Sequence, residues 1–278
     1  MQTPKVVVIT GASAGIGEAL ALELGRAGHR LALAARRPDE LERVARDARE
    51  AGAAAALSVP TDVTRRDEVE RLRDEALEAF GRIDVWVNNA GRGISKPVLQ
   101  LTDADFDEMM TVNVKSALYG MQAVVPHFQE RRAGHLINVS SFLGRVPLAS
   151  VRSVYSAAKA ALNSLTANLR TDLAAEYPEI HVSLVMPGIV KTGFARNALG
   201  AAEGPAAAPP FRPVGPMQPQ TVEEVAAAIA GLLAEPRAEI YTNPASPALA
   251  QRYYADVAAF EAQAAALLRS GGPAGHEK

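Results

Sequence analysis

Short, unbroken apolar runs alternate with longer segments of helical periodicity along almost the whole chain, and this alternation constrains the fold most. The predicted strands cover residues 5–9, 31–34, 55–59, 83–87, 135–139, 181–185 and 239–242. Strands joined by helical crossovers form a parallel sheet covered on both faces, and such strands are apolar along their whole length. The sequence therefore predicts the α/β class, with a single doubly wound parallel sheet of about seven strands and helices on both faces.

Two segments interrupt this alternation. The chain has 278 residues, which suits one large α/β domain, and we expect that domain to cover residues 1–269. Residues 193–220 are rich in proline and alanine and too long for an ordinary connection, so we expect them to form a substrate lid inside the domain. Residues 270–278 contain glycines and a proline, and we expect them to be a disordered tail.

Composition excludes several classes of site and partner. The sequence has no cysteine, which excludes disulfides, catalytic thiolates and zinc–thiolate sites. Its 29 basic and 31 acidic residues give a formal net charge of −2, so nothing in the charge favours nucleic acid or a membrane surface as partner. The apolar runs fall short of the roughly 20 residues that span a bilayer, and the first is too short for a signal-peptide core. We expect a cytoplasmic protein with no metal centre.

A glycine-rich turn, VVVITGASAGIG over residues 6–17, lies between the first predicted strand and the first predicted helix. Part of it spells G-x-S-x-G, the elbow that presents a catalytic serine in hydrolases, which would make Ser13 a nucleophile. That interpretation requires a histidine base near the carboxyl ends of the strands. None of the five histidines follows such an end, so the hydrolase interpretation is disfavoured.

The alternative is a turn that binds the phosphates of a dinucleotide in a Rossmann-type fold. Glycines let the backbone approach a pyrophosphate, and the helix that follows offers its positive end. Glu18 stands where an ATP-binding loop requires lysine, which disfavours ATP. The residues predicted to contact the cofactor here are Gly11, Ser13, Ala14, Gly15, Ile16 and Gly17.

Two arginines follow the second predicted strand and indicate which dinucleotide is bound. A free ribose 2′-hydroxyl is usually held by an acid at this place, but the sequence has Arg36 and Arg37. Guanidinium groups suit a phosphate monoester, which favours NADP(H) over NAD(H). The alternative, a solvated pair of arginines leading into a helix, stays open.

Tyr155 and Lys159 provide a candidate proton donor. They are four residues apart on a helical pattern and so project from one face. An adjacent ammonium favours a phenolate, so we expect Lys159 to lower the pKa of Tyr155. The preceding strand ends in Ser140 and Ser141, and a serine hydroxyl there is suited to hold a substrate oxygen.

Taken together, the motifs TGASAGIG, NNAG, YSAAK and MPGIVKT resemble those of the short-chain dehydrogenase/reductase family, in its order and at its usual separations. The resemblance implies that Tyr155 is the catalytic acid/base, that Lys159 binds the nicotinamide ribose, and that Ser141 orients the carbonyl. It implies that Asn113 holds a water in a proton relay. The loop before Tyr155 is one residue longer than the commonest form, so Ser140 remains an alternative to Ser141, and Asn113 has the alternative role of bridging backbone groups.

The same resemblance implies the remaining cofactor contacts. Asp62 matches the acid that contacts the adenine, and Arg36 matches the position that selects NADP. The segment Asn89–Gly91 matches the wall beside the adenosine ribose, whereas Asn88 is expected only to tie neighbouring strands together. The implied cofactor-binding residues beyond the glycine turn and the arginines are Asp62, Val63, Asn89, Ala90, Gly91, Tyr155, Lys159, Pro187, Gly188, Val190 and Thr192.

The implied activity is hydride transfer between NADP(H) and a carbonyl or secondary alcohol group. The candidate substrate contacts are Ile94, Phe142, Leu143, Val146, Leu148, Val151, Phe194, Phe211 and Met217. These residues are apolar, so an uncharged, moderately apolar small molecule is expected, and the lid contains only one arginine, Arg212, to bind an anion.

Two other functions remain open at this point. The first is a protein that binds NADP(H) and senses redox state without turnover. The second is a nucleotide-sugar epimerase or dehydratase, although the usual T-G-x-x-G-x-x-G turn and large C-terminal domain are absent. The resemblance also implies a homo-dimer or homo-tetramer.

Overall fold

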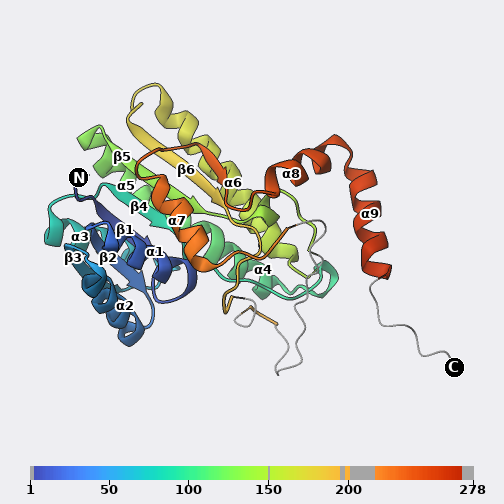
Figure 1. The fold of residues 1–278 in the computed structure, drawn as a ribbon, viewed down its shortest axis with the longest axis horizontal. Coiled ribbons are helices and arrows are strands. Elements are labelled where there is room, and N and C mark those ends of the chain that lie inside the picture. The colour runs from blue at the N-terminus through green and yellow to red at the C-terminus, as the bar shows by residue number, and fades with distance from the viewer. Residues whose placement is uncertain (1–2, 150, 195–197, 201–216, 271–278) are drawn as a thin grey trace.

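One parallel sheet organises the part of the chain that the computed structural model describes, residues 3–149, 151–194, 198–200 and 217–270. Seven strands in these ranges pair in the order β3-β2-β1-β4-β5-β6-β7 (Figure 1). They are β1 (Val6–Thr10), β2 (Arg30–Ala35), β3 (Ala55–Pro60), β4 (Val85–Asn88), β5 (Gly134–Val139), β6 (Ile180–Met186) and β7 (Glu239–Tyr241). The chain leaves the centre in one direction after β1 and in the other from β4, which confirms the predicted doubly wound fold.

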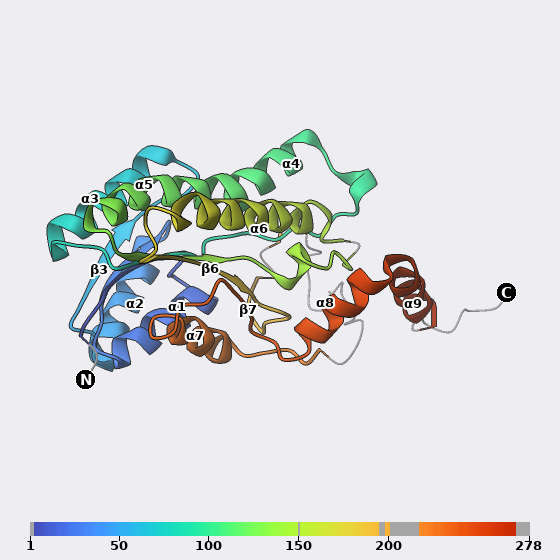
Figure 2. The same ribbon diagram turned by 90° about the horizontal axis from the view of Figure 1, so that it is seen from above.

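Helices cover both faces of this sheet (Figure 2). One face carries α1 (Gly15–Arg26), α2 (Pro38–Ala51) and α7 (Val222–Gly231), and the other carries α3 (Arg66–Phe80), α5 (Ser116–Arg131) and α6 (Ser153–Ala174). A shorter helix, α4 (Asp103–Met110), leads into α5 through a π-helical turn at Thr111–Lys115. The sheet is therefore the middle of three layers.

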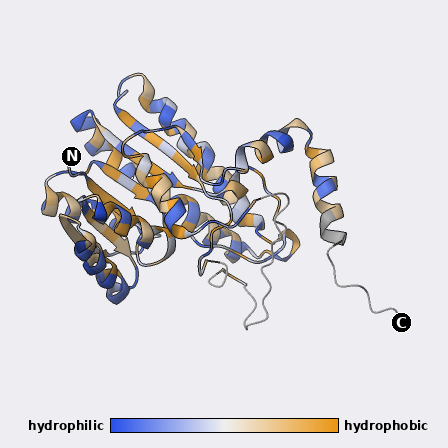
Figure 3. Ribbon diagram, viewed as in Figure 1, coloured by the Kyte–Doolittle hydropathy of each residue, from blue (hydrophilic) through white to orange (hydrophobic). Residues whose placement is uncertain are grey.

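The strands are apolar throughout because each contributes to two cores. In β1 all five residues are buried. Val7 and Ile9 pack with α1, α2 and α7, whereas Val8 packs with α3, α5 and α6. Figure 3 shows the apolar strands between helices of mixed hydropathy. Each fully buried aliphatic side chain contributes roughly 1.5–3 kcal/mol relative to an exposed one, so this pattern fixes which segments become strands.

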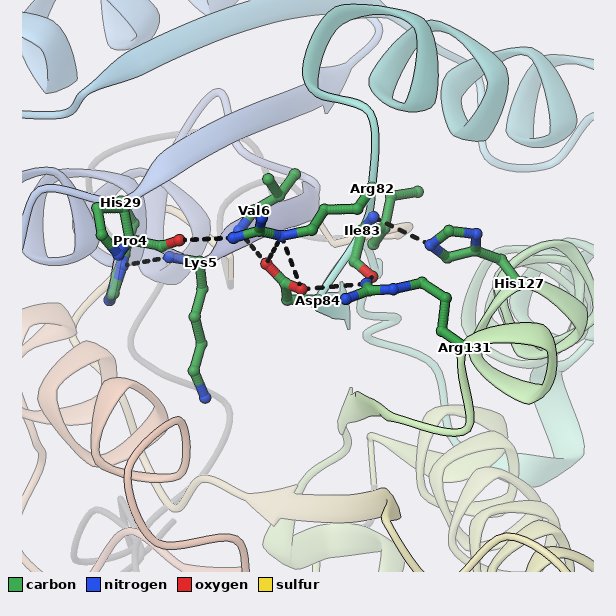
Figure 4. A network of polar contacts seen from close by, with 9 residues as sticks. All are labelled: Pro4, Lys5, Val6, His29, Arg82, Ile83, Asp84, His127 and Arg131. Atoms are coloured by element: carbon green, nitrogen blue, oxygen red, sulfur yellow. Dashed lines mark hydrogen bonds and ion pairs between the residues drawn. The ribbon is translucent and has the colours of Figure 1, made fainter. Parts of the chain in front are cut away.

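The amino end of the sheet is held by a network of polar contacts (Figure 4). The carboxylate of Asp84 accepts a hydrogen bond from the Val6 amide at 2.8 Å and pairs with Arg82 and Arg131. The Ile83 amide donates to Nε2 of His127 at 3.1 Å instead of to a neighbouring strand. As a result β4 begins at Val85, two residues later than the sequence predicts.

Two C-terminal helices lie beyond the carboxyl end of the sheet. They are α8 (Ser246–Ala255) and α9 (Val257–Ser270), and Figure 1 shows α9 standing away from the sheet. Leu249 of α8 and Phe260 of α9 pack in one apolar cluster with Phe142 and Met217. Across the described ranges, no helix is both long and apolar enough to cross a membrane.

Parts of two predicted segments fall outside the described residues. Within the expected lid the structure describes only residues 193–194, 198–200 and 217–220. Phe211 and Arg212 lie outside the described residues, as do residues 271–278 of the expected tail.

Candidate active site

The glycine turn after β1 brings α1 against the loop that follows β4. Gly11 has a φ of +67°, which favours glycine, and a Cβ on it would lie 2.8 Å from the Ala90 Cα. A Cβ on Gly17 would lie 2.3 Å from the carbonyl oxygen of Gly11, so a side chain there would push the helix away from the turn. Both glycines are required for this close approach.

The start of α1 suits an anion. The helix begins at Gly15, and its N-cap residue, Ala14, makes no side-chain cap. Its first N–H groups and its positive end therefore face the turn, where a phosphate is favourable. A Cβ on Gly15 would lie 3.7 Å from Cγ2 of Thr192, so the segment after β6 closes the other side of the turn. Ser13 is half-buried within it, and Ile16 packs against the core below.

The end of β4 forms a rigid wall beside this turn. The side-chain amide of Asn89 donates to the carbonyl oxygens of Thr10, at 2.9 Å, and Gly11, at 3.3 Å. The amides of Asn89 and Ala90 both donate to Oγ1 of Thr10. Asn88 instead donates to Asn138 on β5, at 2.9 Å, and to the backbone of α5, which confirms its predicted role in joining strands.

The ends of β2 and β3 place the other predicted cofactor contacts. Arg36 and Arg37 are exposed after β2, and Arg37 pairs with Glu40 one turn into α2. Asp62 follows β3, and its carboxylate accepts hydrogen bonds from the amide and hydroxyl of Thr64, at 3.0 and 2.7 Å. Val63 packs against the core beneath α3. The geometry leaves Arg36, rather than Arg37, without an acidic partner among the described residues.

Tyr155 and Lys159 project from one face of α6 toward the carboxyl end of β5. The Lys159 Nζ lies 5.8 Å from the centroid of the Tyr155 ring. Both residues are buried, with 3% of Lys159 and 8% of Tyr155 exposed. Nζ donates to the carbonyl oxygen of Val139, the last residue of β5, at 3.0 Å. A Cβ on Gly91 would lie 3.5 Å from Nζ, so the lysine reaches the wall at the end of β4.

Burial controls the pKa values of this pair. It raises the pKa of Tyr155 to about 12, outweighing the opposing effects of a hydrogen bond with Ser141 and of the positive charge on Arg152. It lowers the pKa of Lys159 to about 8. The pKa of Tyr155 is therefore raised and not lowered as predicted, because desolvation outweighs the groups that oppose it, and those groups are Ser141 and Arg152 instead of Lys159.

The two serines after β5 point to different neighbours. The Ser140 hydroxyl donates to Asn163 Oδ1, at 2.5 Å, and to the Lys159 carbonyl oxygen, so it is engaged with α6. Ser141 caps the next 3-10 turn by accepting a hydrogen bond from the Leu143 amide at 3.2 Å, and it is the serine that contacts Tyr155. Of the two alternatives, only Ser141 faces the phenol.

Asn113 lies in the π-helical turn before α5 and is buried. Its amide group donates to the carbonyl oxygens of Arg92 and Met109, at 3.0 and 3.1 Å, and its oxygen accepts from the Arg92 amide at 3.2 Å. A Cβ on Gly91 would lie 2.9 Å from that oxygen, so Asn113 is within the site. Its contacts here are those of the backbone-bridging alternative.

The segment after β6 shapes the mouth of the site. The carbonyl oxygen of Pro187 accepts from the Phe142 amide at 2.8 Å. A Cβ on Gly188 would lie 3.0 Å from Sδ of Met217, and Val190 pairs with Gln220 in a short bridge. These contacts hold the predicted nicotinamide-side turn against the loop that follows β5.

The predicted substrate contacts fall into two groups. Ile94, Leu143 and Phe194 pack with Tyr155, and the rings of Phe194 and Tyr155 are 5.5 Å apart between centroids. The second group packs in an apolar cluster with α8 and α9. It comprises Phe142, Val146, Leu148 and Met217. Val151 is half-buried in the turn that precedes α6. Only the first group surrounds the phenol.

Sequence reasoning missed Arg152, three residues before Tyr155. It is 7% exposed, and Nη1 donates to the carbonyl oxygen of Ile94 at 2.8 Å. The only signal available was its place in the sequence, three residues before Tyr155, because Arg152 is the N-cap residue and precedes α6. Sequence position did not reveal its burial against the loop that contains Ile94.

The chain is similar to short-chain dehydrogenases. The family model "short chain dehydrogenase" matches residues 5–202. An "uncharacterized oxidoreductase" of Staphylococcus aureus (strain N315) is 37% identical over 190 residues, which are 68% of this chain and 80% of the relative. Among solved structures, an alcohol dehydrogenase from the archaeon Thermococcus sibiricus, complexed with 5-hydroxy-NADP, is 30% identical with a TM-score of 0.73, over 87% of this chain and 97% of that chain. A short chain dehydrogenase/reductase from Burkholderia phymatum, in complex with NAD, is 30% identical with a TM-score of 0.80, over 92% and 95%.

Proposed function

Since the chain belongs to the short-chain dehydrogenase/reductase family, and is thereby a nicotinamide-dependent oxidoreductase, we propose that it uses NADP(H) to interconvert a carbonyl and a secondary alcohol group of a moderately apolar small molecule. The observation that carries this proposal is the convergence of Ser141, Tyr155 and Lys159 at the carboxyl end of β5, beside the glycine turn. Ligands of doubly wound sheets bind at this edge.

The residues present fit a dinucleotide. The turn at Gly11 and the uncapped start of α1 would hold the phosphates, and Lys159 would donate hydrogen bonds to the nicotinamide ribose. With its pKa at about 8, Lys159 is mostly charged at neutral pH and therefore suited to that task. When bound, the nicotinamide supplies the hydride in one direction and accepts it in the other.

Tyr155 moves the proton that accompanies the hydride. With its pKa at about 12 it is protonated at neutral pH, so in reduction its hydroxyl proton passes to the carbonyl oxygen while the carbonyl carbon takes the hydride. Ser141 donates its hydroxyl hydrogen to the same oxygen and orients it. In the reverse direction Tyr155 must first lose its proton, which burial opposes.

Arg36 is the basis for proposing NADP(H). Its guanidinium follows β2 and has no acidic partner among the described residues, whereas Arg37 is paired with Glu40. A free, exposed guanidinium at this position suits the 2′-phosphate. Self-association as a homo-dimer or homo-tetramer, and a cytoplasmic location, are further parts of the proposal that rest on the sequence.

The proposal is tested by mixing the protein with NADPH and a panel of ketones and aldehydes, and with NADP⁺ and the matching alcohols. We expect NADPH absorbance to fall with at least one carbonyl compound and the alcohol product to appear. Binding of NADPH without turnover across the panel would instead favour the redox-sensor alternative. A product altered at a nucleotide-sugar carbon without net NADPH use would favour the epimerase alternative.

A further inference from the structure

Arg152 is a buried arginine with no carboxylate beside it. Among the residues that the structure describes it is the only arginine with less than a tenth of its surface exposed. Its guanidinium donates one hydrogen bond, from Nη1 to the Ile94 carbonyl oxygen at 2.8 Å, and forms no ion pair within those residues. A guanidinium has five N–H donors, so most of its capacity is unused.

Two arginines on the loops after β4 and β5 are neutralised by acidic side chains. Arg92, on the loop after β4, pairs with Glu108 of α4. Arg145, on the loop after β5, pairs with Glu239 of β7, with 2.5 Å between Nη2 and Oε2. Both are more exposed than Arg152 and yet carry an acidic partner. Arg152 therefore differs from these two arginines, because it has no acidic partner although it is more buried. An unpaired charge destabilises a protein more when it is buried than when it is exposed.

The position of Arg152 is the substrate side of Tyr155. Its Nη1 would lie 3.0 Å from a Cβ on Gly93, and the same Cβ would lie 2.7 Å from Cε1 of Phe194. Phe194 in turn packs edge-on against the Tyr155 ring. The guanidinium is thus next to the apolar group that surrounds the phenol, and the Tyr155 pKa responds to its charge.

The electrostatics of this position favour an added anion. Burial lowers the pKa of Arg152, because taking a guanidinium out of water without a counter-charge disfavours its charged form. A carboxylate brought to it would supply the counter-charge and could accept two parallel hydrogen bonds from its planar fork. No described side chain of the protein does this.

We propose that Arg152 is a substrate-binding residue that holds an anionic group, and that the substrates are oxo acids and the corresponding hydroxy acids with an apolar body. This inference rests on the proposed function and narrows it. The uncharged substrate expected from sequence is thereby replaced by one with an apolar part against Leu143 and Phe194 and a carboxylate at Arg152.

Matched acid and ester pairs test the inference. The probes are benzoylformate and 4-acetylbenzoate, each compared with its methyl ester, at neutral pH with saturating NADPH. For at least one pair we expect kcat/KM to be at least tenfold higher for the acid. Arg152→Gln should lower kcat/KM for that acid at least thirtyfold and for its ester less than threefold, and Arg152→Lys should retain part of the preference. Equal losses for acid and ester, or no preference for either acid, would overturn the inference.

Two controls separate binding of the anion from folding. Arg145→Gln removes a paired arginine from the same edge of the sheet and should leave the acid-to-ester ratio unchanged. If Arg152→Gln does not fold, the test uses the wild type instead. Its reduction of an ester substrate is measured in the presence of benzoate and, separately, of benzamide. At least tenfold stronger inhibition by benzoate supports the inference, and equal inhibition contradicts it.

A binding measurement distinguishes failure of this inference from failure of the proposed function. In the NADPH-loaded Tyr155→Phe variant, calorimetry should detect benzoylformate or 4-acetylbenzoate, and adding Arg152→Gln should weaken that binding at least tenfold. If this holds while the wild type reduces none of the probes, the inference stands and the proposed function fails. If the wild type reduces acids and esters equally well, the function stands and Arg152 does not bind the anion.

Discussion

The two ends of the sheet carry similar kinds of polar side chain but use them differently. At the amino end, Asp84 accepts from the Val6 amide and pairs with Arg82 and Arg131. The ring of His127 accepts from a backbone amide there (Figure 4). At the carboxyl end, most of the N–H groups of the Arg152 guanidinium have no acceptor among the described protein groups, and the hydroxyl of Tyr155 hydrogen-bonds with Ser141.

The comparison separates stabilising groups from groups available for chemistry. A hollow of about 520 Å³ at the amino end is lined by charged residues, among them Arg82, Asp84 and Arg131, but these neutralise one another. The carboxyl end instead leaves the guanidinium groups of Arg36 and Arg152 without an acid among the described residues, and the start of α1 without a side-chain cap. The presence of polar residues or of a hollow therefore does not by itself mark the active site.

The largest expected effect is on Tyr155 at the carboxyl end. Tyr155→Phe removes the proton donor without changing the ring that packs on Phe194, so kcat should fall by roughly 10²- to 10⁴-fold. Binding of NADPH, measured by fluorescence titration, and the melting temperature should change little. A variant that kept most of its activity would place the proton chemistry elsewhere.

The next effect compares the two ends of one strand, β2. Arg36→Ala should raise KM for NADPH by on the order of 100-fold and leave KM for NADH nearly unchanged, since a charge-assisted hydrogen bond to phosphate is lost. Arg30→Ala removes the exposed arginine that starts the same strand at the amino end, and should alter neither constant. Equal changes for both cofactors in Arg36→Ala would remove the basis for NADP(H).

A third effect belongs to the amino end. Burial alone would raise the pKa of Asp84, but hydrogen bonds from Val6, Arg82 and Arg131 hold it below its usual range. Asp84→Asn should therefore lower the free energy of unfolding by about 2 kcal/mol at neutral pH, by denaturant titration, while kcat stays the same. Unchanged stability would mean that the network does not hold the strand starts, and a large fall in kcat would mean that the two ends are not separate.

The smallest effect is a pH dependence of stability that also comes from the amino end. His135 on β5 is buried, and its Nε2 hydrogen-bonds Ser183 Oγ at 2.8 Å, whose hydroxyl donates to the Arg237 carbonyl oxygen. Burial lowers the pKa of His135 to about 3. Because the folded pKa lies below the unfolded value of about 6.5, the stability it contributes is complete above pH 6.5 and is lost as pH falls toward 3.

This dependence is measured by comparing unfolding free energies at pH 7 and pH 5. The wild type should lose stability over this interval, and His135→Gln, which has no proton to take up, should lose less. Parallel curves for the two proteins would show that His135 is not held neutral by the fold.

The sequence predicted the fold well because apolar runs reflect burial on two faces, as in β1. It misplaced the start of β4 because periodicity cannot reveal hydrogen bonds between backbone amides and side chains of distant segments. Here the Val6 amide donates to Asp84 and the Ile83 amide donates to His127. At the site, residue type and spacing identified Tyr155 and Lys159, since one helix carries both.

Three-dimensional surroundings explain what the sequence could not supply. The Tyr155 pKa is raised, although the sequence predicted a lowered value, because segments distant in the sequence bury the phenol. Arg152 was missed because its burial depends on Ile94 and Phe194, which come from two loops that are distant in the sequence. Spacing alone therefore found the proton donor but not the group beside it.

The most direct test of the central claim, that hydride transfer occurs at the carboxyl end beside Tyr155, uses NADPH deuterated at nicotinamide C4. For a carbonyl compound that consumes NADPH, mass spectrometry of the alcohol formed should find one deuterium on the carbinol carbon with the wild type and almost no product with Tyr155→Phe. A protein that binds the deuterated cofactor but forms no labelled alcohol, or forms it equally well without the phenol, would contradict the account.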